Sequence, residues 1–507
     1  MHALQKKMYE FQRQHPIASV SKTLREIRRN IISILVTLFV GASSEAIPFH
    51  LLIYIGIPLI FVIGVVAWWR FQYKIEDGEL HIRSGIFVRK NLYLTRDRVQ
   101  VIDISSGVLQ RLFGLVKVDI QTAGSTSRDA SIEAVTAEKA DLINRLLRNG
   151  AQQKSADEEA ENVESEKSKV YSLPGKHLLI AATTSGRFGI ILSVMGTIFS
   201  QIEPVIRESE IFDYLFSMLP SQTDGIMIAS IILIVIVAAW IFSFFSTLLM
   251  YGDFSVEVKK EEIVIMRGIF EKKRITVPYN RIQAIYVNEG LVRQPLGYAS
   301  AHLESAGYGD DKGTGSLMLF PLIPRKKVEK LIKEIVPQHD VKIDGYTPPF
   351  KTLRRYIFRA AFIILLITGL VYYFLYNAAW IWIFPALSIF WGWLKYKDAG
   401  IGWDRDNIIL RSRTLSKTTA IIKRNRIQDI SINQSPIQRY RNLCTIQVYV
   451  ASGDHGKSFS VKDLDYDDVQ MLYVDLQKRK EKETERELTI PQRKAETTLP
   501  GWKVNVA

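Results

Sequence analysis

One seven-residue motif occurs three times in the chain: RDRVQVI at residues 96–102, YNRIQAI at residues 279–285 and RNRIQDI at residues 424–430. The shared core is Arg, then Val or Ile, then Gln, one variable residue and Ile. The similarity continues in register further on, where QRLFG at 110–114 matches RQPLG at 293–297 and, more loosely, QRYRN at 438–442. Self-similarity at long spacing indicates repeated structural units. We therefore predict three homologous domains in one chain.

The sequence around each motif is typical of antiparallel β-structure. Asp77-Gly78 is a strong signal for a two-residue hairpin turn between strands. The segments VKVDI at 116–120 and TIQVYV at 445–450 alternate apolar and polar residues, as half-buried strands do. Each copy ends in a helical pattern, which in the first copy places Ala140, Ile143 and Leu147 on one face. We expect each copy to be a small β-barrel with a C-terminal helix.

Apolar segments precede each of the three copies. A helix needs roughly 20 apolar residues to cross a bilayer. Two clear segments cover residues 51–69 and 226–250, and a third, over 360–393, is long enough for two helices with a turn near Asn377. Two shorter segments cover residues 31–44 and 188–202. The sequence thus predicts a membrane α plus β protein with six transmembrane helices in three hairpins, each followed by a cytosolic domain.

The distribution of charge predicts the orientation of these hairpins. Residues 6–29 are rich in Lys and Arg, whereas the connection over 201–225 is acidic and carries Arg207 as its only cation. Lys and Arg near transmembrane segments favour the cytoplasmic side. We therefore expect a multi-pass protein of the cell (plasma) membrane, with both termini and all three β-rich domains in the cytoplasm.

The domain boundaries expected from these patterns follow the chain in order. They are an N-terminal segment with hairpin 1 (1–70), domain 1 (71–149), a disordered linker (150–170), hairpin 2 (171–252), domain 2 (253–337), hairpin 3 (338–397), domain 3 (398–477) and a charged tail (478–507).

Composition and residue spacing argue against catalysis, cofactor binding and nucleic-acid binding. The eight histidines show no metal-ligand spacing. Cys444, the single cysteine, lies beside a strand and is interpreted as a packing residue. The net charge of +14 suits an anionic partner, but no recognition helix or aromatic binding ribbon accompanies it. We expect no enzyme activity, no cofactor, no metal and no nucleic acid.

Two groups of residues are candidates for a binding site. The first is a polar site in the repeat core, formed by Arg98, Gln100, Arg281, Gln283, Arg426 and Gln428. The second comprises basic residues that could contact anionic lipid: Lys272, Lys273, Arg274, Arg411, Arg413 and Lys417. The repeat-core residues could instead satisfy backbone groups within the fold. The basic residues could equally be solvated charges that set the topology.

The threefold arrangement of hairpin and domain resembles the membrane-flanked bacterial pleckstrin-homology-like (PH-like) domain family, and within it the YdbT-like group. The resemblance implies two near-orthogonal antiparallel sheets capped by a C-terminal helix, and no known enzyme activity. It also implies a link to envelope stress or resistance to membrane-active peptides. A smaller PH-like companion with one hairpin is the membrane protein partner that the resemblance implies.

Two functions remain open at this point. The first is a membrane scaffold whose cytosolic domains bind protein partners or one another, with the lipid bilayer as anchor. The second is a transporter or membrane-embedded enzyme that uses the six-helix region. The second would require ionisable groups deep within several spans, and the clear spans lack them. The sequence therefore favours the scaffold.

Overall fold

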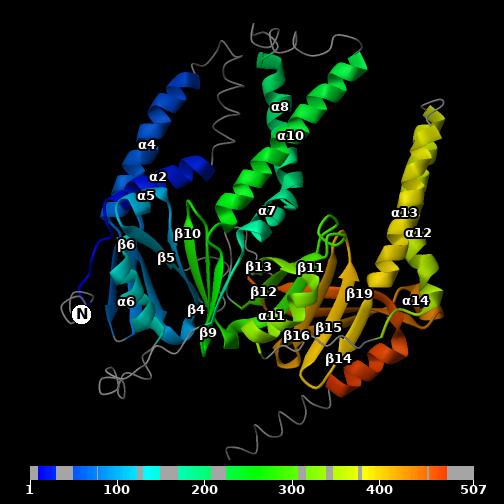
Figure 1. Ribbon diagram of the computed structural model, residues 1–507. Helices are drawn as coiled ribbons and strands as arrows, with labels where there is room; N and C mark the ends of the chain where they lie inside the picture. The colour runs from blue at the N-terminus through cyan, green and yellow to red at the C-terminus, as the bar shows by residue number, and fades with distance from the viewer. Residues whose placement is uncertain are drawn as a thin grey trace, which may run out of the picture. The chain divides into compact units, whose positions relative to one another are not determined.

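The computed structural model describes residues 9–29, 49–76, 78–122, 130–148, 169–206, 224–306, 316–337, 346–374, 379–453 and 456–476 (Figure 1). The chain divides into two compact units. The first comprises residues 1–283, 289–336 and 451–456, and the second comprises residues 284–288, 337–450 and 457–507.

The first β-rich domain, in the first unit, is built from two antiparallel sheets. Its strands are β1 (Gln72–Glu76), β2 (Glu79–Ser84) and β3 (Lys90–Thr95), then β4 (Val99–Ser106), β5 (Leu115–Thr122) and β6 (Ala130–Thr136), followed by helix α6 (Ala137–Arg148). Glu76 pairs with Glu79, and Gly78 has a φ of 78°. This confirms the predicted hairpin, although Asp77 itself lies outside the described residues.

The second domain, which lies in the first unit apart from residues 284–288, has the same order of elements. Its strands are β8 (Ser255–Val258), β9 (Glu262–Arg267), β10 (Lys272–Pro278), β11 (Ile282–Glu289), β12 (Tyr298–Ser305) and β13 (Ser316–Pro324), and it ends in α11 (Val328–Ile335). An additional strand, β7 (Lys169–Ser172), precedes the helices of this repeat and pairs with β8, which follows them. The helices are therefore inserted between two hydrogen-bonded strands.

The other two repeats show the same insertion in a shorter form. Gln12 precedes the first helices and forms a β-bridge with Tyr73 of β1. Tyr346 precedes the third pair of helices and forms a bridge with Ile401. Each β-rich domain thus begins before its helices and resumes after them. The backbone just before the helices is therefore hydrogen-bonded to the strand that follows them.

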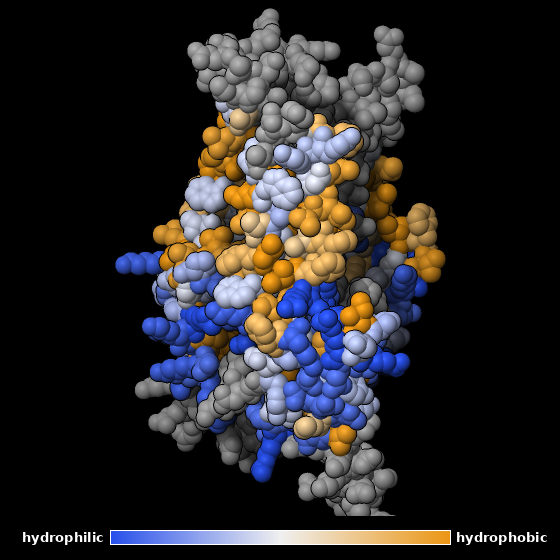
Figure 2. Space-filling view, turned by 90° about the vertical axis from the view of Figure 1, so that its right-hand side faces the viewer, coloured by the Kyte–Doolittle hydropathy of each residue, from blue (hydrophilic) through white to orange (hydrophobic). Residues whose placement is uncertain are grey.

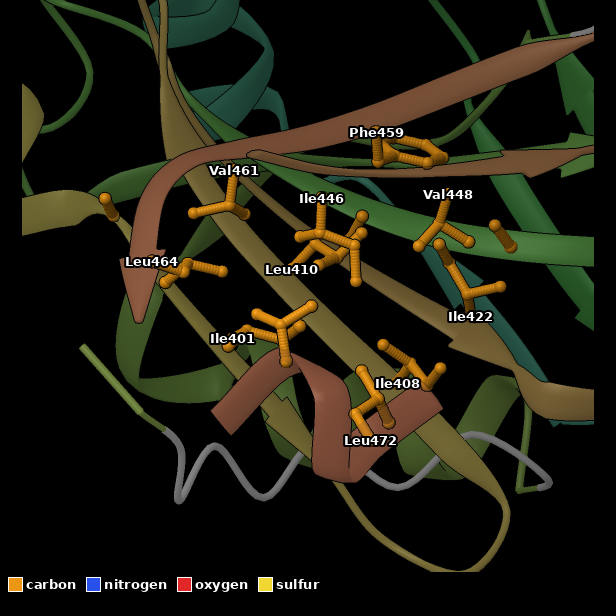
Figure 3. Close-up of a cluster of buried hydrophobic side chains, with 14 of the residues drawn as sticks. Ile401, Ile408, Leu410, Ile422, Ile446, Val448, Phe459, Val461, Leu464 and Leu472 are labelled. Carbon is orange, nitrogen blue, oxygen red and sulfur yellow. The ribbon is translucent and has the colours of Figure 1, made fainter. Parts of the chain in front are cut away.

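The third domain lies in the second unit, apart from residues 451–456 between its last two strands. Its strands are β14 (Gly400–Trp403), β15 (Asn407–Arg413) and β16 (Lys417–Lys423), then β17 (Ile427–Asn433), β18 (Leu443–Val450) and β19 (Lys457–Asp465), followed by a helix over residues 466–476. Leu410, Ile422, Ile446 and Val461 point from the two sheets into one core (Figure 3). Full burial of such a side chain stabilises the fold by about 1.5–3 kcal/mol.

The repeated sequence motif adopts the same local structure in all three domains. It forms a short 3₁₀ turn that leads directly into a strand: η1 (Arg96–Arg98) before β4, η2 (Tyr279–Arg281) before β11 and η6 (Arg424–Arg426) before β17. The residue after each turn has φ between −67° and −73° and ψ of 121° or 122°. The predicted threefold repetition is therefore confirmed in the backbone.

The apolar helices are α4 (Phe49–Trp69), α8 (Phe188–Ile206), α10 (Asp224–Tyr251), α12 (Leu353–Phe374) and α13 (Ile383–Asp398). Two described segments are long and apolar enough to cross a membrane, Ile232–Tyr251 and Phe350–Phe374. A third exists if α7 (Gly175–Thr183) and the bent continuation Phe188–Thr197 form one span. The predicted span at residues 31–44 lies outside the described residues, so six spans stay a prediction. On the face in Figure 2, hydrophobic residues cover the helical part and hydrophilic residues cover the strand-bearing part.

The first two domains share one sheet. Strand β4 of the first domain pairs with β10 of the second, and the resulting sheet has the order β6-β5-β4-β10-β9-β8-β7. Ser105 lies opposite Lys273, and Ile104 lies opposite Arg274. The same kind of neighbour occurs within the second unit, where residues 284–288 of β11 lie beside β16. The sequence predicted separate barrels; the shared sheet is an additional feature.

Candidate functional site

The arginines and glutamines of the repeat core do not converge on one site. Arg98 is exposed, whereas Arg281 and Arg426 are partly buried at the ends of their 3₁₀ turns. The Nε2 atom of Gln283, which is buried, donates a hydrogen bond to the carbonyl oxygen of Arg281 at 3.1 Å. Gln428 is exposed on β17, and the side chain of Gln100 lies outside the described residues.

This geometry gives the motif a local structural role in the second domain. The Gln283 amide donates to the carbonyl oxygen of Arg281 in the 3₁₀ turn, which also accepts from the backbone N–H of Ala306. In the third domain, burial and then the charge of nearby Arg426 lower the pKa of Lys423. A role of these residues in ligand binding stays a prediction.

The basic candidates of the second domain lie at the joint between the first two domains. Lys272, Lys273 and Arg274 begin β10, where each lies opposite a residue of β4. Arg274 contacts Asp141 of α6 in the first domain at 3.6 Å, and Lys273 contacts Glu271 at 3.4 Å. Lys272 is more exposed and lies 3.9 Å from Asp253. These cations therefore lie beside carboxylates of both domains.

The basic candidates of the third domain are less accessible than the sequence indicated. Arg413 and Lys417 are 6% and 5% exposed. The guanidinium of Arg413 pairs with the carboxylate of Asp398 at 2.5 Å, and Arg411 donates to the carbonyl oxygen of Asp398 at 2.9 Å. Asp398 ends helix α13, so both arginines join that helix to β15. Contact of these residues with lipid stays a prediction.

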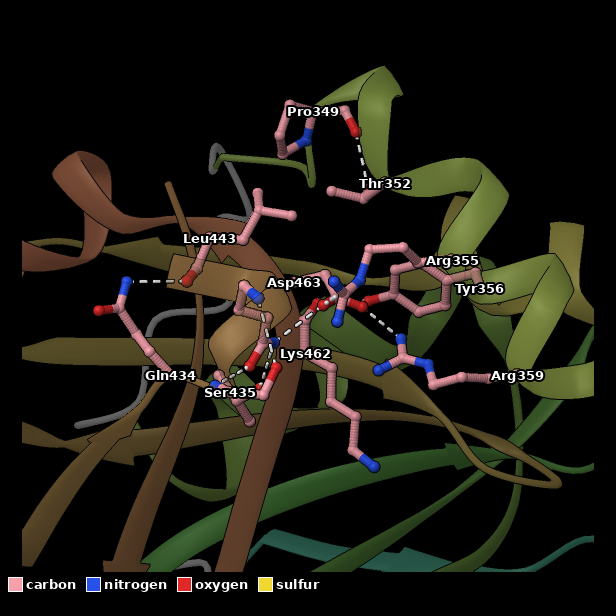
Figure 4. A network of polar contacts seen from close by, with 12 residues as sticks. Pro349, Thr352, Arg355, Tyr356, Arg359, Gln434, Ser435, Leu443, Lys462 and Asp463 are labelled. Atoms are coloured by element: carbon pink, nitrogen blue, oxygen red, sulfur yellow. Dashed lines mark hydrogen bonds and ion pairs between the residues drawn. The ribbon is translucent and has the colours of Figure 1, made fainter. Parts of the chain in front are cut away.

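A second polar network lies where helix α12 meets the third domain (Figure 4). At its centre is Asp463 of β19, which is fully buried. Its carboxylate lies 3.2 Å from Nε of Arg355 and pairs with Arg359, both on α12. Gln438 donates to the same carboxylate at 2.8 Å. One carboxylate thus joins the apolar helix to two elements of the domain.

Neighbouring contacts fix the orientation of this network. The hydroxyl of Tyr356, on α12, donates to the carbonyl oxygen of Lys462 at 2.5 Å. Gln438 also forms a capping box with Ser435 at the start of α14 (Pro436–Tyr440), so its side chain is held by both of its polar ends. Capping boxes satisfy backbone donors that a helix start leaves unpaired. The network therefore positions α12, α14 and β19 together.

The second domain binds its membrane-entry helix with a different residue at the same repeat position. Arg293 aligns with Gln438 in the repeat register. Its guanidinium donates to Thr184 Oγ1 at 3.0 Å and to the carbonyl oxygens of Ala181 and Pro321 at 3.2 and 3.0 Å. Burial lowers the pKa of this guanidinium. Arg293 thereby joins the end of α7 to strand β13.

The first domain makes comparable contacts at the aligned position. Gln110, which aligns with Arg293 and Gln438, donates to Ser21 Oγ of α2 (Ile17–Arg29) at 3.2 Å. The segment just before α2 binds β6, because Gln14 Oε1 accepts from the backbone N–H of Glu133 at 2.9 Å. His15 N–H donates to the carbonyl oxygen of Ala134 at 3.0 Å. We call these three sets of contacts the helix clasps. Each joins the segment that enters a hairpin to the last strand of its domain and to the residue at the position of Gln110, Arg293 or Gln438.

The helix clasps contain functional candidates that the sequence did not identify. Asp463, Arg355 and Arg359 were not singled out, and Gln110, Arg293 and Gln438 were quoted only as part of the repeat. The available signal was the polar residue that recurs at one register position in each copy. Gln110 and Arg293 contact residues that lie 89 to 112 positions earlier in the chain. Gln438 instead contacts Asp463 of β19, which pairs with Arg355 and Arg359 of α12.

A metal-ligating cluster or the single cysteine could supply a reactive group among the described residues. Among them, no group of three or more His, Cys, Asp or Glu side chains is placed to hold a metal ion. Cys444 is completely buried in the core of the third domain, and this burial raises the pKa of its thiol to about 12. A protonated, inaccessible thiol is a poor nucleophile.

Comparison with known proteins identifies the repeated unit. The bacterial PH domain family matches three regions, residues 30–151, 211–338 and 356–480. The chain is 33% identical to UPF0699 transmembrane protein YdbT of Bacillus subtilis (strain 168) over 483 residues, which cover 92% of this chain and 98% of that protein. It is also 33% identical over 94 residues to UPF0699 transmembrane protein YdbS of the same organism, covering 18% of this chain and 59% of that protein. The resemblance drawn from the repeats is thereby confirmed.

Proposed function

Because the chain belongs to the bacterial PH domain family and contains three matches to it, we propose that it is a non-enzymatic membrane scaffold. Its three PH-like domains would lie on the cytoplasmic face, each held by its own transmembrane hairpin, with six spans in total. The observation that carries this proposal is the sheet shared by the first two domains. Strand pairing between domains gives a fixed spacing and orientation, as a scaffold requires.

The helix clasps support the same proposal. A domain joined to its hairpin only through a flexible linker could turn freely at the membrane. Here Asp463 and Arg293 bind the membrane-entry helices directly to β-strands of their domains. Loss of Asp463 would leave the charges of Arg355 and Arg359 without this partner, and loss of Arg293 would remove the donor that three oxygen atoms share. The arrangement favours a rigid platform over a set of tethered modules.

We propose two classes of partner for this scaffold. The first is a smaller PH-like membrane protein with one hairpin. The relative YdbS supports this class, because the 94 residues that match this chain make up 59% of its length, so short homologues exist. The second is the anionic surface of the inner leaflet, which attracts nearby Lys and Arg by about 1 kcal/mol each. Lys272 is the most exposed of the three candidates in the second domain and suits this contact best. A role in envelope stress stays a prediction.

The orientation is tested by cysteine labelling in whole cells. Tyr440 is 90% exposed on the third domain, and Ser209 belongs to the acidic connection of hairpin 2, outside the described residues. We expect Ser209→Cys to react with a membrane-impermeant thiol reagent, and Tyr440→Cys to react only after the membrane is opened. The natural Cys444 gives little background because it is buried. Labelling of Tyr440→Cys in sealed cells, without labelling of Ser209→Cys, would contradict the proposed orientation.

A further inference from the structure

Strands β4 and β10 form the joint between the first two domains, and each has an equivalent strand elsewhere in the chain that lies at a sheet edge. Alignment of the repeats at Arg98, Arg281 and Arg426 makes β17 the counterpart of β4, and β3 the counterpart of β10. Among the described strands, β3 ends the sheet β1-β2-β3 and β17 ends the sheet β17-β18-β19. The chain therefore carries one unused copy of each half of its own joint.

The exposure of these strands differs from that of their paired counterparts. In the joint, Ser105 of β4 is 6% exposed, and Thr276 of β10 is 4% exposed. Their counterparts at the open edges, Asn433 and Tyr93, are exposed, with Tyr93 at 56%. Phe87, in the turn before β3, is 95% exposed, compared with 56% for its counterpart Phe270 beside the joint. An edge that combines open backbone groups with apolar side chains is a site for strand addition.

The two residues whose contact closes the joint also have counterparts beside the open edges. Arg111 of the first domain donates from its guanidinium to the carbonyl oxygen of Ile269 in the second domain at 2.6 Å. The counterpart of Arg111 is Arg439, which follows β17 and is exposed. The counterpart of Ile269 is Ile86, which precedes β3. The donor and the acceptor of the closing contact thus stand beside the two free strands.

We propose that β17 of one chain pairs with β3 of a second copy of the same chain, in the register of the β4–β10 joint. That register places Lys90 opposite Asn433 and Asn91 opposite Ile432, with Arg439 bound to the backbone at Ile86. The contact is head-to-tail, so it uses different surfaces on the two copies and builds closed rings or open rows in the membrane plane. The proposal extends the scaffold function, because copies held in one membrane face each other at high effective concentration.

Cysteine cross-linking between differently tagged copies tests the register. One copy carries Lys90→Cys and the other carries Asn433→Cys, and membranes that contain both are oxidised. We expect a disulfide-linked product with both tags. The matched control replaces Asn433→Cys with Gln428→Cys, an exposed site on the same strand five residues away, which is about 17 Å along an extended strand. Absence of the mixed product, or equal cross-linking at Gln428, would overturn the proposal.

A second measurement does not depend on introduced cysteines. The purified full-length protein should exceed the mass of one 58.0 kDa chain after correction for detergent. Arg439→Ala should raise the dissociation constant by about tenfold, since a hydrogen bond to a charged group contributes roughly that factor. Arg441→Ala, an exposed neighbour, should leave it unchanged. A single-chain mass at every concentration overturns self-assembly, whereas failure of the labelling test in whole cells would instead overturn the orientation of the scaffold.

Discussion

At the scale of single residues, Asp463 connects the apolar helix α12 to the third PH-like domain. It has a positive φ of 55°, is fully buried and pairs with Arg355 and Arg359. Asp463→Ala removes the carboxylate and leaves both guanidinium groups without it. Removing one partner of a buried ion pair lowers the free energy of unfolding by about 3–5 kcal/mol. We expect a loss of about 3 kcal/mol here, because Arg355 and Arg359 both remain partly exposed to solvent.

The natural Cys444 reports this loss directly. Its thiol is buried and has a raised pKa, so it reacts with maleimide only when the third domain opens. We expect Asp463→Ala to increase the labelling rate by about 100-fold, the factor that corresponds to about 3 kcal/mol of opening free energy. Asp406→Ala, which removes an exposed carboxylate of the same domain, serves as the control. Equal labelling rates in all three proteins would show that Asp463 does not stabilise the domain.

At the scale of elements, the helix clasps decide how firmly each hairpin is held. Arg293→Ala deletes three hydrogen bonds from the guanidinium of Arg293. Two go to the end of α7, at Ala181 and Thr184, and one goes to Pro321 of β13. Each bond to a charged group contributes about 1.5–3 kcal/mol, although the three are not independent. We expect faster hydrogen exchange in α7 and β13, with little change in the distant strands β1 to β3. Arg293→Lys should not restore protection, because an ammonium cannot reproduce the planar fork of the guanidinium.

The matched control for this element is Lys176→Ala. Lys176 lies on α7 as well, but it is exposed. Its removal should leave hydrogen exchange as in the parent protein. If Arg293→Ala also leaves α7 and β13 unchanged, the clasp of the second domain does not couple helix and strand.

The sequence predicted these elements unevenly, for identifiable physical reasons. The motif around Arg98, Arg281 and Arg426 encodes a local turn and strand, so its repetition was readable from the sequence alone. The ion pair of Arg413 with Asp398 was not, because it depends on where α13 ends relative to β15. Charge runs indicate accessible cations only when no carboxylate packs against them. The shared sheet was also not predicted. Alternating hydropathy shows that a segment is a strand, but it does not show which strand of another domain it pairs with.

At the scale of the whole molecule, the central claim is that PH-like domains of one chain are joined by strand pairing. The joint between β4 and β10 places Ser105 directly opposite Lys273. The doubly substituted protein, Ser105→Cys with Lys273→Cys, should therefore form an intrachain disulfide in membranes under mild oxidation. A pair shifted along the strand, Ser105→Cys with Val277→Cys, gives the comparison, because four residues correspond to about 13 Å.

The most direct measurement is cleavage of the oxidised protein at a protease site introduced between residues 150 and 168, followed by electrophoresis without reductant. We expect the two fragments to stay linked for the Ser105–Lys273 pair and to separate for the shifted pair. Separation of both pairs, or linkage only of the shifted pair, would contradict the shared sheet and with it the scaffold built on it.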